Sequence, residues 1–154
     1  MTVHASQAAR PAAFSAPQGI RIDSALGPDA VSEGIALLEG TYWNEGVSPE
    51  MMARSFLAST VWVGARDDSG ALVGMARALS DLSKVAWIFD VVVRPDWRGK
   101  GIAQAIMRLI LSHPAVRDVA KVRLATRDAE RLYEKFGFRI AGPPKHLEMI
   151  RARS

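Results

Sequence analysis

Apolar residues in the first third of the chain recur at helical spacing, three to four positions apart. This pattern predicts one helix that opens at Gly27-Pro28-Asp29 and closes at Gly40. A second helix is expected from Ser48-Pro49-Glu50, because serine caps a helix N-terminus and proline suits the first helical turn. Ile20 and Ile22 alternate with polar neighbours, which predicts a short strand ahead of both helices.

The apolar pattern changes to the period of a strand at Val61. Residues 61–66 and 72–77 flank the turn Asp67-Asp68-Ser69-Gly70 and predict a hairpin, and residues 85–93 predict a third strand of the same antiparallel meander. The second half then alternates between strands and helices. It predicts a strand at 119–125, a short helix at 128–136, and closing strands that begin at Gly137-Phe138 and end with residues 147–150.

This order of elements predicts an α/β fold, or α+β in stricter schemes, with a mixed, mostly antiparallel sheet of about six to seven strands and helices on both faces. Residues 1–18 hold Ala, Ser, Gln and Pro without an apolar period, so we expect a flexible N-terminal tail. Because 49% of the 154 residues are hydrophobic, residues 19–154 are expected to form a single domain with a full core.

A strand, a glycine-rich loop and a helix follow one another in the middle of the second half. The β-branched run Val91–Val93 leads through a turn to Arg98-Gly99-Lys100-Gly101, and a helical apolar pattern begins at Ile102. Such a junction directs unpaired backbone N–H groups and the positive end of the helix dipole at one point. The loop therefore predicts a site for an anion such as a pyrophosphate. The alternative is that the glycines only form a tight turn.

Two other glycine-loop motifs fit this loop poorly. A P-loop requires Ser or Thr after a Gly-Lys pair to hold magnesium, whereas Gly101 and Ile102 follow Lys100. A dinucleotide fingerprint requires a small residue three positions after Gly101, where this chain has Gln104. Neither motif is expected here.

Charge is divided unevenly between the two halves of the chain. Residues 1–80 contain five Arg and eight Asp or Glu, and residues 81–154 contain fifteen Lys or Arg and eight acids, so their net charges are −3 and +7. The basic half suits an anionic ligand, either a phosphate-bearing cofactor or a nucleic acid. No nucleic-acid partner is expected, because basic and aromatic residues are not interleaved as they are on such surfaces.

The chain contains no cysteine, which excludes disulfides, thiolate metal sites and a cysteine nucleophile. Its three histidines are scattered, so no metal site is expected. No apolar run is long enough to span a membrane, and the N-terminal sequence lacks the basic-then-apolar order of a signal peptide. We therefore expect a cytoplasmic protein without membrane contact.

Two motifs carry a resemblance to a known family. Arg98-Gly99-Lys100-Gly101-Ile102-Ala103 resembles the Arg/Gln-x-x-Gly-x-Gly/Ala acyl-CoA signature of the GCN5-related N-acetyltransferases, the GNAT family. Leu132-Tyr133-Glu134-Lys135-Phe136-Gly137-Phe138 resembles the C-terminal motif of that family. The resemblance extends over roughly Gly19 to Arg151. It implies the acyl-CoA N-acyltransferase (GNAT) fold, with acetyl-CoA as co-substrate.

The resemblance also implies which residues bind coenzyme A. The pyrophosphate would lie on the backbone amides of Arg98, Gly99, Lys100, Gly101, Ile102 and Ala103, and the pantetheine arm would pair with the backbone of Val91, Val92 and Val93. Phe136 of the second motif belongs to the same cofactor-binding set. Thr126 stands where the family often has an Asn that contacts the pantetheine, and it offers one hydroxyl in place of an amide.

Tyr133 is the expected general acid. In a helix over residues 128–136, Tyr133 shares one face with Ala129, Leu132 and Phe136, so its ring should be buried. A buried hydroxyl requires a hydrogen-bond partner. The partner could be a backbone carbonyl or, as the resemblance implies, the sulfur of CoA, which would receive a proton from the phenol as it leaves.

Asp90 is the candidate base, because a carboxylate interrupts an otherwise apolar strand just before the cofactor segment. The alternative is that Asp90 accepts hydrogen bonds from a loop or pairs with an arginine. Glu39 and Glu45 are weaker candidates. Tyr42 and Trp43, which adjoin each other between the first two helices, are expected either to wall a substrate pocket or to cover the core.

These observations together predict an N-acetyltransferase that moves an acetyl group from acetyl-CoA to a primary amine of a small molecule or peptide by direct attack. A non-catalytic acyl-CoA-binding sensor is the alternative. The acidic first half favours a cationic acceptor amine. A homodimer is a further expectation, because dimers are common among proteins that resemble this one.

Overall fold

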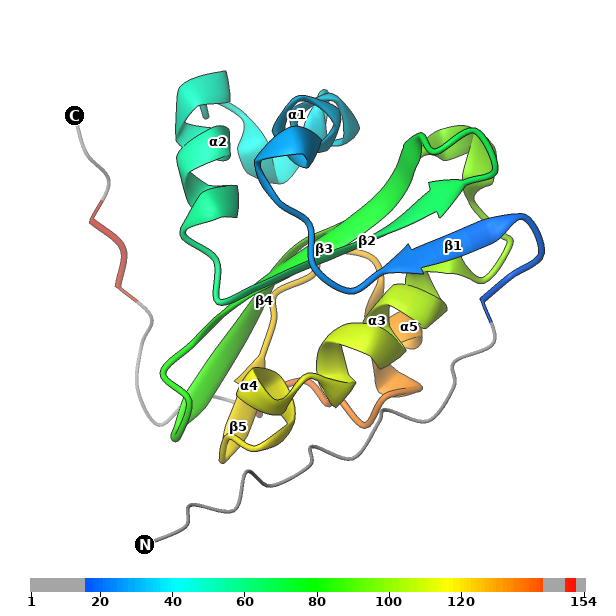
Figure 1. Cartoon of the computed structure of the whole chain (residues 1–154). Helices are drawn as coiled ribbons and strands as arrows, with labels where there is room; N and C mark the ends of the chain where they lie inside the picture. The colour runs from blue at the N-terminus through cyan, green and yellow to red at the C-terminus, as the bar shows by residue number, and fades with distance from the viewer. Residues whose placement is uncertain (1–15, 143–148, 152–154) are drawn as a thin grey trace, which may run out of the picture.

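The computed structural model describes residues 16–142 and 149–151, which form a five-stranded sheet between two layers of helices (Figure 1). The strands are β1 (Ile20–Asp23), β2 (Val61–Asp67), β3 (Leu72–Ser80), β4 (Val85–Val93) and β5 (Lys121–Arg123), and they lie side by side in that order. The α-helices are α1 (Val31–Leu38), α2 (Pro49–Leu57), α3 (Ile102–Ser112), α4 (Pro114–Arg117) and α5 (Glu130–Glu134). Short 3-10 turns occur at η1 (Pro28–Ala30), η2 (Tyr42–Asn44) and η3 (Pro95–Trp97).

The first two helices begin where the sequence predicts. The Ser48 hydroxyl oxygen accepts a hydrogen bond of 3.2 Å from the Met51 N–H, and Pro49 is the first residue of α2. This cap satisfies one of the N–H groups that a helix leaves unpaired at its start. Gly27-Pro28-Asp29 leads into η1, which continues directly into α1. Both predicted starts are confirmed.

Two apolar cores lie on opposite faces of the sheet. On one face, the fully buried Ile106, Met107 and Ile110 of α3 pack against the sheet. On the other face, Leu38 of α1 and Phe56 of α2 pack against residues of β2, β3 and β4. Each such side chain contributes roughly 1.5–3 kcal/mol by burial. The helices are therefore fixed on both faces, and the sheet between them is held rigidly.

The ladder between β4 and β5 is short. Strands β1 to β4 form an antiparallel meander, whereas β5 runs parallel to β4 and pairs with it only over Val85–Trp87 and Lys121–Arg123. Beyond Trp87, no described strand pairs with that edge of β4. Because β4 continues to Val93, the remaining two thirds of the strand has backbone N–H and C=O groups on an open edge.

A β-bulge interrupts β4 at Asp90. Met75 of β3 stands opposite Val92, but Arg77, two residues on, stands opposite Phe89, so β4 contains one extra residue between these pairs. Asp90 has a φ of +54°, a conformation that Asp and Asn tolerate better than most residues. The bulge bends β4 beside its open edge.

The C-terminal part of the chain differs from the prediction. The described residues form five strands, fewer than the six to seven expected, because residues 137–142 pair with no strand. Residues 147–148 of the expected closing strand at 147–150 lie outside the described residues, as does most of the expected tail at 1–18, and residues 149–150 form no strand. The strand predicted at 119–125 is only Lys121–Arg123, and the helix predicted at 128–136 is only Glu130–Glu134. None of the helices within residues 16–142 and 149–151 is long and apolar enough to cross a membrane.

Candidate active site

A cleft of about 1760 Å³ opens where β4 and β5 separate. We call one part of its lining the glycine-loop half, formed by residues 91–93 of β4, the loop at 98–101 and the start of α3. We call another part the aromatic half, formed by Tyr42, Trp43, Asn44, Arg77, Trp87 and Phe89. Asp90 and Tyr133 also line the cleft, which brings the two sequence motifs and the first inter-helix connection together.

The glycine loop has the backbone conformation that only glycine adopts easily. Gly99 and Gly101 have φ angles of +75° and +82°, and no side chain caps the N-terminus of α3. A Cβ atom at Gly99 would meet no atom within 4 Å, so the backbone here borders open space. The Arg98 side chain donates a 3.0 Å hydrogen bond from its Nε to the Val93 carbonyl oxygen and ties the loop to β4. The first N–H groups of α3 are therefore placed to bind an anion.

Two predicted cofactor residues do not line the cleft. Lys100 places its ammonium group 4.6 Å from the centre of the Trp97 ring, and Trp97 itself lines the cleft. Phe136 is half-buried and packs against the α3 core. The other residues predicted to bind the cofactor do line the cleft: Val91, Val92, Val93, Arg98, Gly99, Gly101, Ile102, Ala103, Thr126 and Tyr133.

Tyr133 is buried, as its position on α5 predicts, with 8% of its surface exposed. Burial raises the pKa of its phenol above the ordinary value of 10.0, and the negative charges of nearby Tyr42 and Asp128 when ionised raise it further. Its ring packs edge-on against Phe138, with the ring centres 6.1 Å apart. The phenol therefore keeps its proton at neutral pH and can donate it into the cleft.

Thr126 has a structural contact in addition to its place in the cleft. Its hydroxyl oxygen accepts a 3.0 Å hydrogen bond from the Ala129 N–H, just ahead of α5. This hydrogen bond orders the turn that leads into α5, the short helix that carries Tyr133.

Asp90 is held by three donors from two parts of the chain. One carboxylate oxygen accepts hydrogen bonds from the Trp43 indole N–H at 3.0 Å and the Asn44 amide at 3.3 Å. The other accepts from the Arg77 Nε at 2.6 Å. Only 6% of the Asp90 side chain and 13% of the Arg77 side chain are exposed. These contacts match the alternative stated for Asp90, in which its carboxylate pairs with an arginine and orders a loop. A role for Asp90 as the base stays a prediction.

The aromatic half contains residues that the sequence did not single out. Tyr42 and Trp43 line the cleft as expected, about half exposed, with their rings edge-on and 5.0 Å apart. Trp87 and Phe89 of β4 lie beside them in the lining, stacked at 6.2 Å with an interplanar angle of 17°. The sequence does contain a signal that could have identified Trp87 and Phe89. These large aromatics alternate with the buried Ala86 and Ile88, as residues on the opposite face of a strand do.

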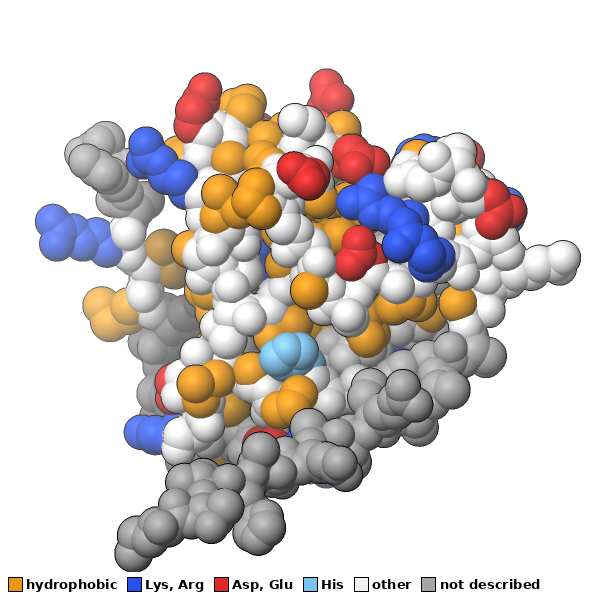
Figure 2. Space-filling view, viewed as in Figure 1, with side chains coloured by type: hydrophobic (Ala, Val, Ile, Leu, Met, Phe, Trp, Pro, Cys, Tyr) orange, Lys and Arg blue, Asp and Glu red, His pale blue; other side chains and the backbone are white. Residues whose placement is uncertain are grey.

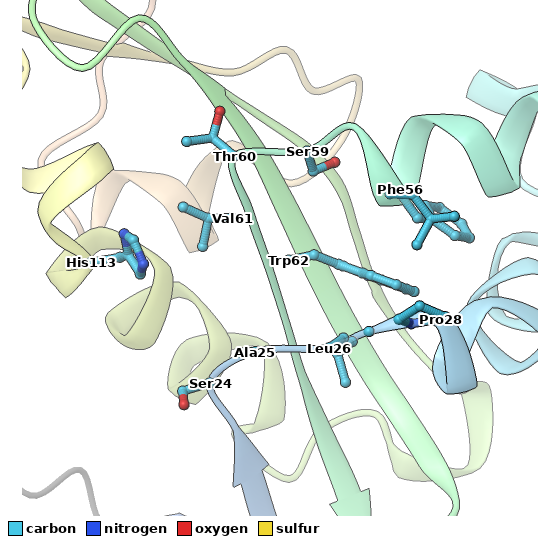
Figure 3. Close-up of a pocket in the computed structure, with 12 residues that line it drawn as sticks. Ser24, Ala25, Leu26, Pro28, Phe56, Ser59, Thr60, Val61, Trp62 and His113 are labelled. Atoms are coloured by element: carbon cyan, nitrogen blue, oxygen red, sulfur yellow. The ribbon is translucent and has the colours of Figure 1, made fainter.

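A second pocket of about 300 Å³ lies at the start of β2 (Figure 3). Val61 and Trp62 belong to this strand, with His113 at the end of α3 on one side and Phe56 of α2 on the other. His113 accepts a hydrogen bond from the Ala115 N–H on its Nδ1 and caps α4. The pocket contains none of the predicted site residues, so the β4–β5 cleft is the candidate active site.

The fold and the cleft agree with a family assignment. Residues 33–138 match the model of the acetyltransferase (GNAT) family, a span that includes the glycine loop, the bulge and Tyr133. The chain therefore belongs to the GNAT acetyltransferase family, as its two motifs predict.

Known proteins with similar sequences and structures give the same assignment. An uncharacterized N-acetyltransferase, ycf52, from Porphyra purpurea is 37% identical over 73 residues, which cover 47% of this chain and 42% of that protein. A Xanthomonas campestris protein of the gnat family has a crystal structure that superposes with a TM-score of 0.71 at 25% identity, covering 88% of this chain and 96% of that one. A Clostridium acetobutylicum acetyltransferase solved with acetyl-CoA shares the fold, with a TM-score of 0.66 at 17% identity, covering 85% and 96%.

Proposed function

We propose that this chain transfers an acetyl group from acetyl-CoA to a primary amine of a small molecule or peptide. One observation carries the proposal: a single cleft is lined by the uncapped start of a helix, by the open edge of a bulged strand and by a buried tyrosine whose pKa is raised. Acetyl-CoA in the Clostridium acetobutylicum structure of the same fold supports this choice of co-substrate.

The residues of the glycine-loop half fit coenzyme A. The N–H groups at the start of α3 suit its pyrophosphate, and Gly99 and Gly101, which adopt positive φ angles, leave that backbone without side chains. The open edge of Val91–Val93 offers strand-like hydrogen bonds to an extended amide chain such as pantetheine. Acetyl-CoA, when bound, supplies an acetyl group activated as a thioester.

Direct attack requires no covalent enzyme intermediate, consistent with a chain without cysteine. A bond forms between the amine nitrogen and the acetyl carbon while the bond to sulfur breaks. Tyr133 donates its proton to the leaving sulfur, because its raised pKa keeps the phenol protonated, and the second proton released by the attacking nitrogen returns to the tyrosine through water. The ammonium group of the acceptor must first lose a proton, and Asp90 or an ordered water is the proposed base. Backbone N–H groups near the bulge polarise the carbonyl and position it.

Consumption of acetyl-CoA over a panel of primary amines tests the proposal, with release of the free thiol as the readout. Tyr133→Phe should lower kcat by roughly a hundredfold or more, the usual contribution of a positioned general acid. Calorimetry with CoA should give a dissociation constant close to that of the parent, because the phenol acts on the leaving sulfur. A Phe variant as fast as the parent would remove the acid role.

The alternative is an acyl-CoA-binding sensor without catalysis. A sensor would bind CoA and release no thiol with any amine of the panel, and Tyr133→Phe would then have no rate to change. A cytoplasmic location and a homodimer stay predictions, which cell fractionation and light scattering would test.

A further inference from the structure

The aromatic half of the cleft pairs guanidinium groups with aromatic rings. Three arginines from different elements each place the central guanidinium carbon within 6 Å of a ring centre. The pairs are Arg77 with Phe89 at 4.9 Å, Arg123 with Trp87 at 5.8 Å, and Arg127 with Tyr42 at 3.8 Å. A guanidinium over a ring face keeps its N–H edge available for a further partner.

The three arginines differ in how their charge is balanced. Arg77 is neutralised by the buried carboxylate of Asp90. Arg127 meets Asp128 only at 3.7 Å, and both side chains are more than half exposed, so this ion pair is weak. Within the described residues, no carboxylate lies within 4 Å of the Arg123 guanidinium. Arg127 therefore adds positive charge to the lining of the cleft, and Arg123, which does not itself line the cleft, adds positive charge beside Trp87, which does.

An apolar surface formed by Trp87, Phe89 and Leu79 lies next to these arginines, and we call it the ledge. Trp87 and Phe89 are half-buried and stacked, and Leu79 of β3 and Arg123 of β5 flank Trp87 in the sheet register. Leu79 is 43% exposed. The ledge suits the hydrocarbon part of a ligand whose anionic group reaches Arg123 or Arg127.

The acids of the first half are partly engaged elsewhere. Asp and Glu side chains gather over α1 on the face shown in Figure 2. Glu33 of α1 bonds Arg66 at 2.9 Å, and Asp23, the last residue of β1, bonds the same arginine at 3.3 Å. Glu39 lines the cleft and is exposed. The net charge of the first half is thus a poor guide to the charge of the aromatic half.

We propose that the acceptor amine also carries a carboxylate, bound by Arg123 and Arg127, while Trp87 and Phe89 contact the carbon chain between the two groups. This inference rests on the proposed acetyl transfer and names the class of acceptor. Planar guanidinium groups bind carboxylates through paired N–H···O bonds, which fixes the orientation of the acceptor as well as adding affinity. Both free amino carboxylates and peptides supply this chemistry.

Matched acceptors test the proposal. The panel contains ω-amino carboxylates of increasing chain length, each with its primary amide, short peptides with free or amidated C-termini, and diamines. For the preferred length, kcat/KM should be roughly tenfold or more higher for the acid than for its amide. Arg123→Gln and Arg127→Gln should each reduce that ratio several-fold. The control is Arg108→Gln, which removes an exposed charge on α3 outside the cleft and should leave the ratio unchanged.

Three results would overturn the carboxylate proposal. Amides or diamines could react as fast as the acids, or the ratio of kcat/KM for the acid to that for its amide could be unchanged in both arginine variants. The variants could instead raise the KM for acetyl-CoA, which would assign the arginines to cofactor phosphates. If no amine reacts at all, acetyl transfer fails first. The carboxylate site is then tested by calorimetric titration of the amino carboxylates into the CoA-bound protein, where weaker binding to the two arginine variants supports the site and equal binding refutes it.

Discussion

Asp90→Asn tests whether the buried carboxylate orders the active site. The substitution keeps the shape of the side chain, and Asn tolerates the φ of +54° as well as Asp does, so backbone strain should not change. The amide oxygen can still accept from Trp43 and Asn44. What is lost is the charge opposite Arg77, whose side chain is only 13% exposed.

The expected loss of stability follows from this burial. Removing one partner of a buried ion pair costs about 3–5 kcal/mol, because the other charge stays buried and uncompensated. Since Arg77 keeps some access to water, we expect the lower end, about 3 kcal/mol. For a chain of this size that loss lowers Tm by roughly 6–12 °C. Urea unfolding, with the slope m checked against the parent, measures the free energy directly.

Asp96→Asn is the matched control. Asp96 also pairs with an arginine, Arg94, at 2.7 Å, but its side chain is 63% exposed. Exposed pairs of this kind contribute about 0–1 kcal/mol. If Asp90→Asn costs no more than Asp96→Asn, the buried pair does not order the site and the reasoning from burial fails.

The pH profile of the same variant separates ordering from base catalysis. If Asp90 only orders Trp43 and the bulge, kcat/KM should fall by a similar factor at every pH. If Asp90 is the base, the pH profile of kcat/KM should change its shape in the Asn variant. A changed shape would support the base role, and an unchanged shape would contradict it.

Two further predictions concern the other end of the cleft. The pKa of Tyr133 is raised above 10.0 in the folded protein, so the stability that its neutral form contributes is complete below pH 10 and is lost as pH rises through the folded pKa. Urea unfolding of Tyr133→Phe should therefore lack this loss of stability at alkaline pH. An unchanged loss would contradict the raised pKa of Tyr133. Gly101→Ala should cost roughly 1–2 kcal/mol, because φ is +82° there, and should raise the KM for acetyl-CoA. Gly70→Ala, at φ +86° in the β2–β3 turn, is the control with equal strain and an unchanged KM.

The conformation of the glycine loop could be predicted because it depends on the backbone. Glycines at positions 99 and 101, placed between a β-branched strand and an amphipathic helix, leave few other arrangements. The burial of Tyr133 followed from helical periodicity in the same way, even though α5 is shorter than predicted. Local sequence sufficed at these positions because the structure there is local.

The partners of Asp90 could not be predicted from local sequence. Trp43 and Asn44 are more than forty positions away, and Arg77 lies on the neighbouring strand. The cation–ring contacts of Arg123 and Arg127 likewise depend on the register of β5 and on how the η2 turn lies over the cleft. The net charge of each half of the chain averages over these contacts, so it carries no information on which charged side chains face the cleft, and the cationic acceptor stays a prediction.

The bulge at Asp90 explains how β4 can serve both the core and the cleft. Before it, Ala86 and Ile88 face α3, so Trp87 and Phe89 face the opposite side. In a regular strand Val92 would also face α3, yet it packs in the core under α1 and α2. The extra residue shifts the alternation by one. On the side of β4 that faces α1, Val92 therefore packs in the core after the bulge, and Trp87 and Phe89 line the aromatic half of the cleft before it. A strict two-residue period read along the sequence places Trp87 and Phe89 on one face of β4, but it cannot show that Val92, beyond the bulge, packs on that same face.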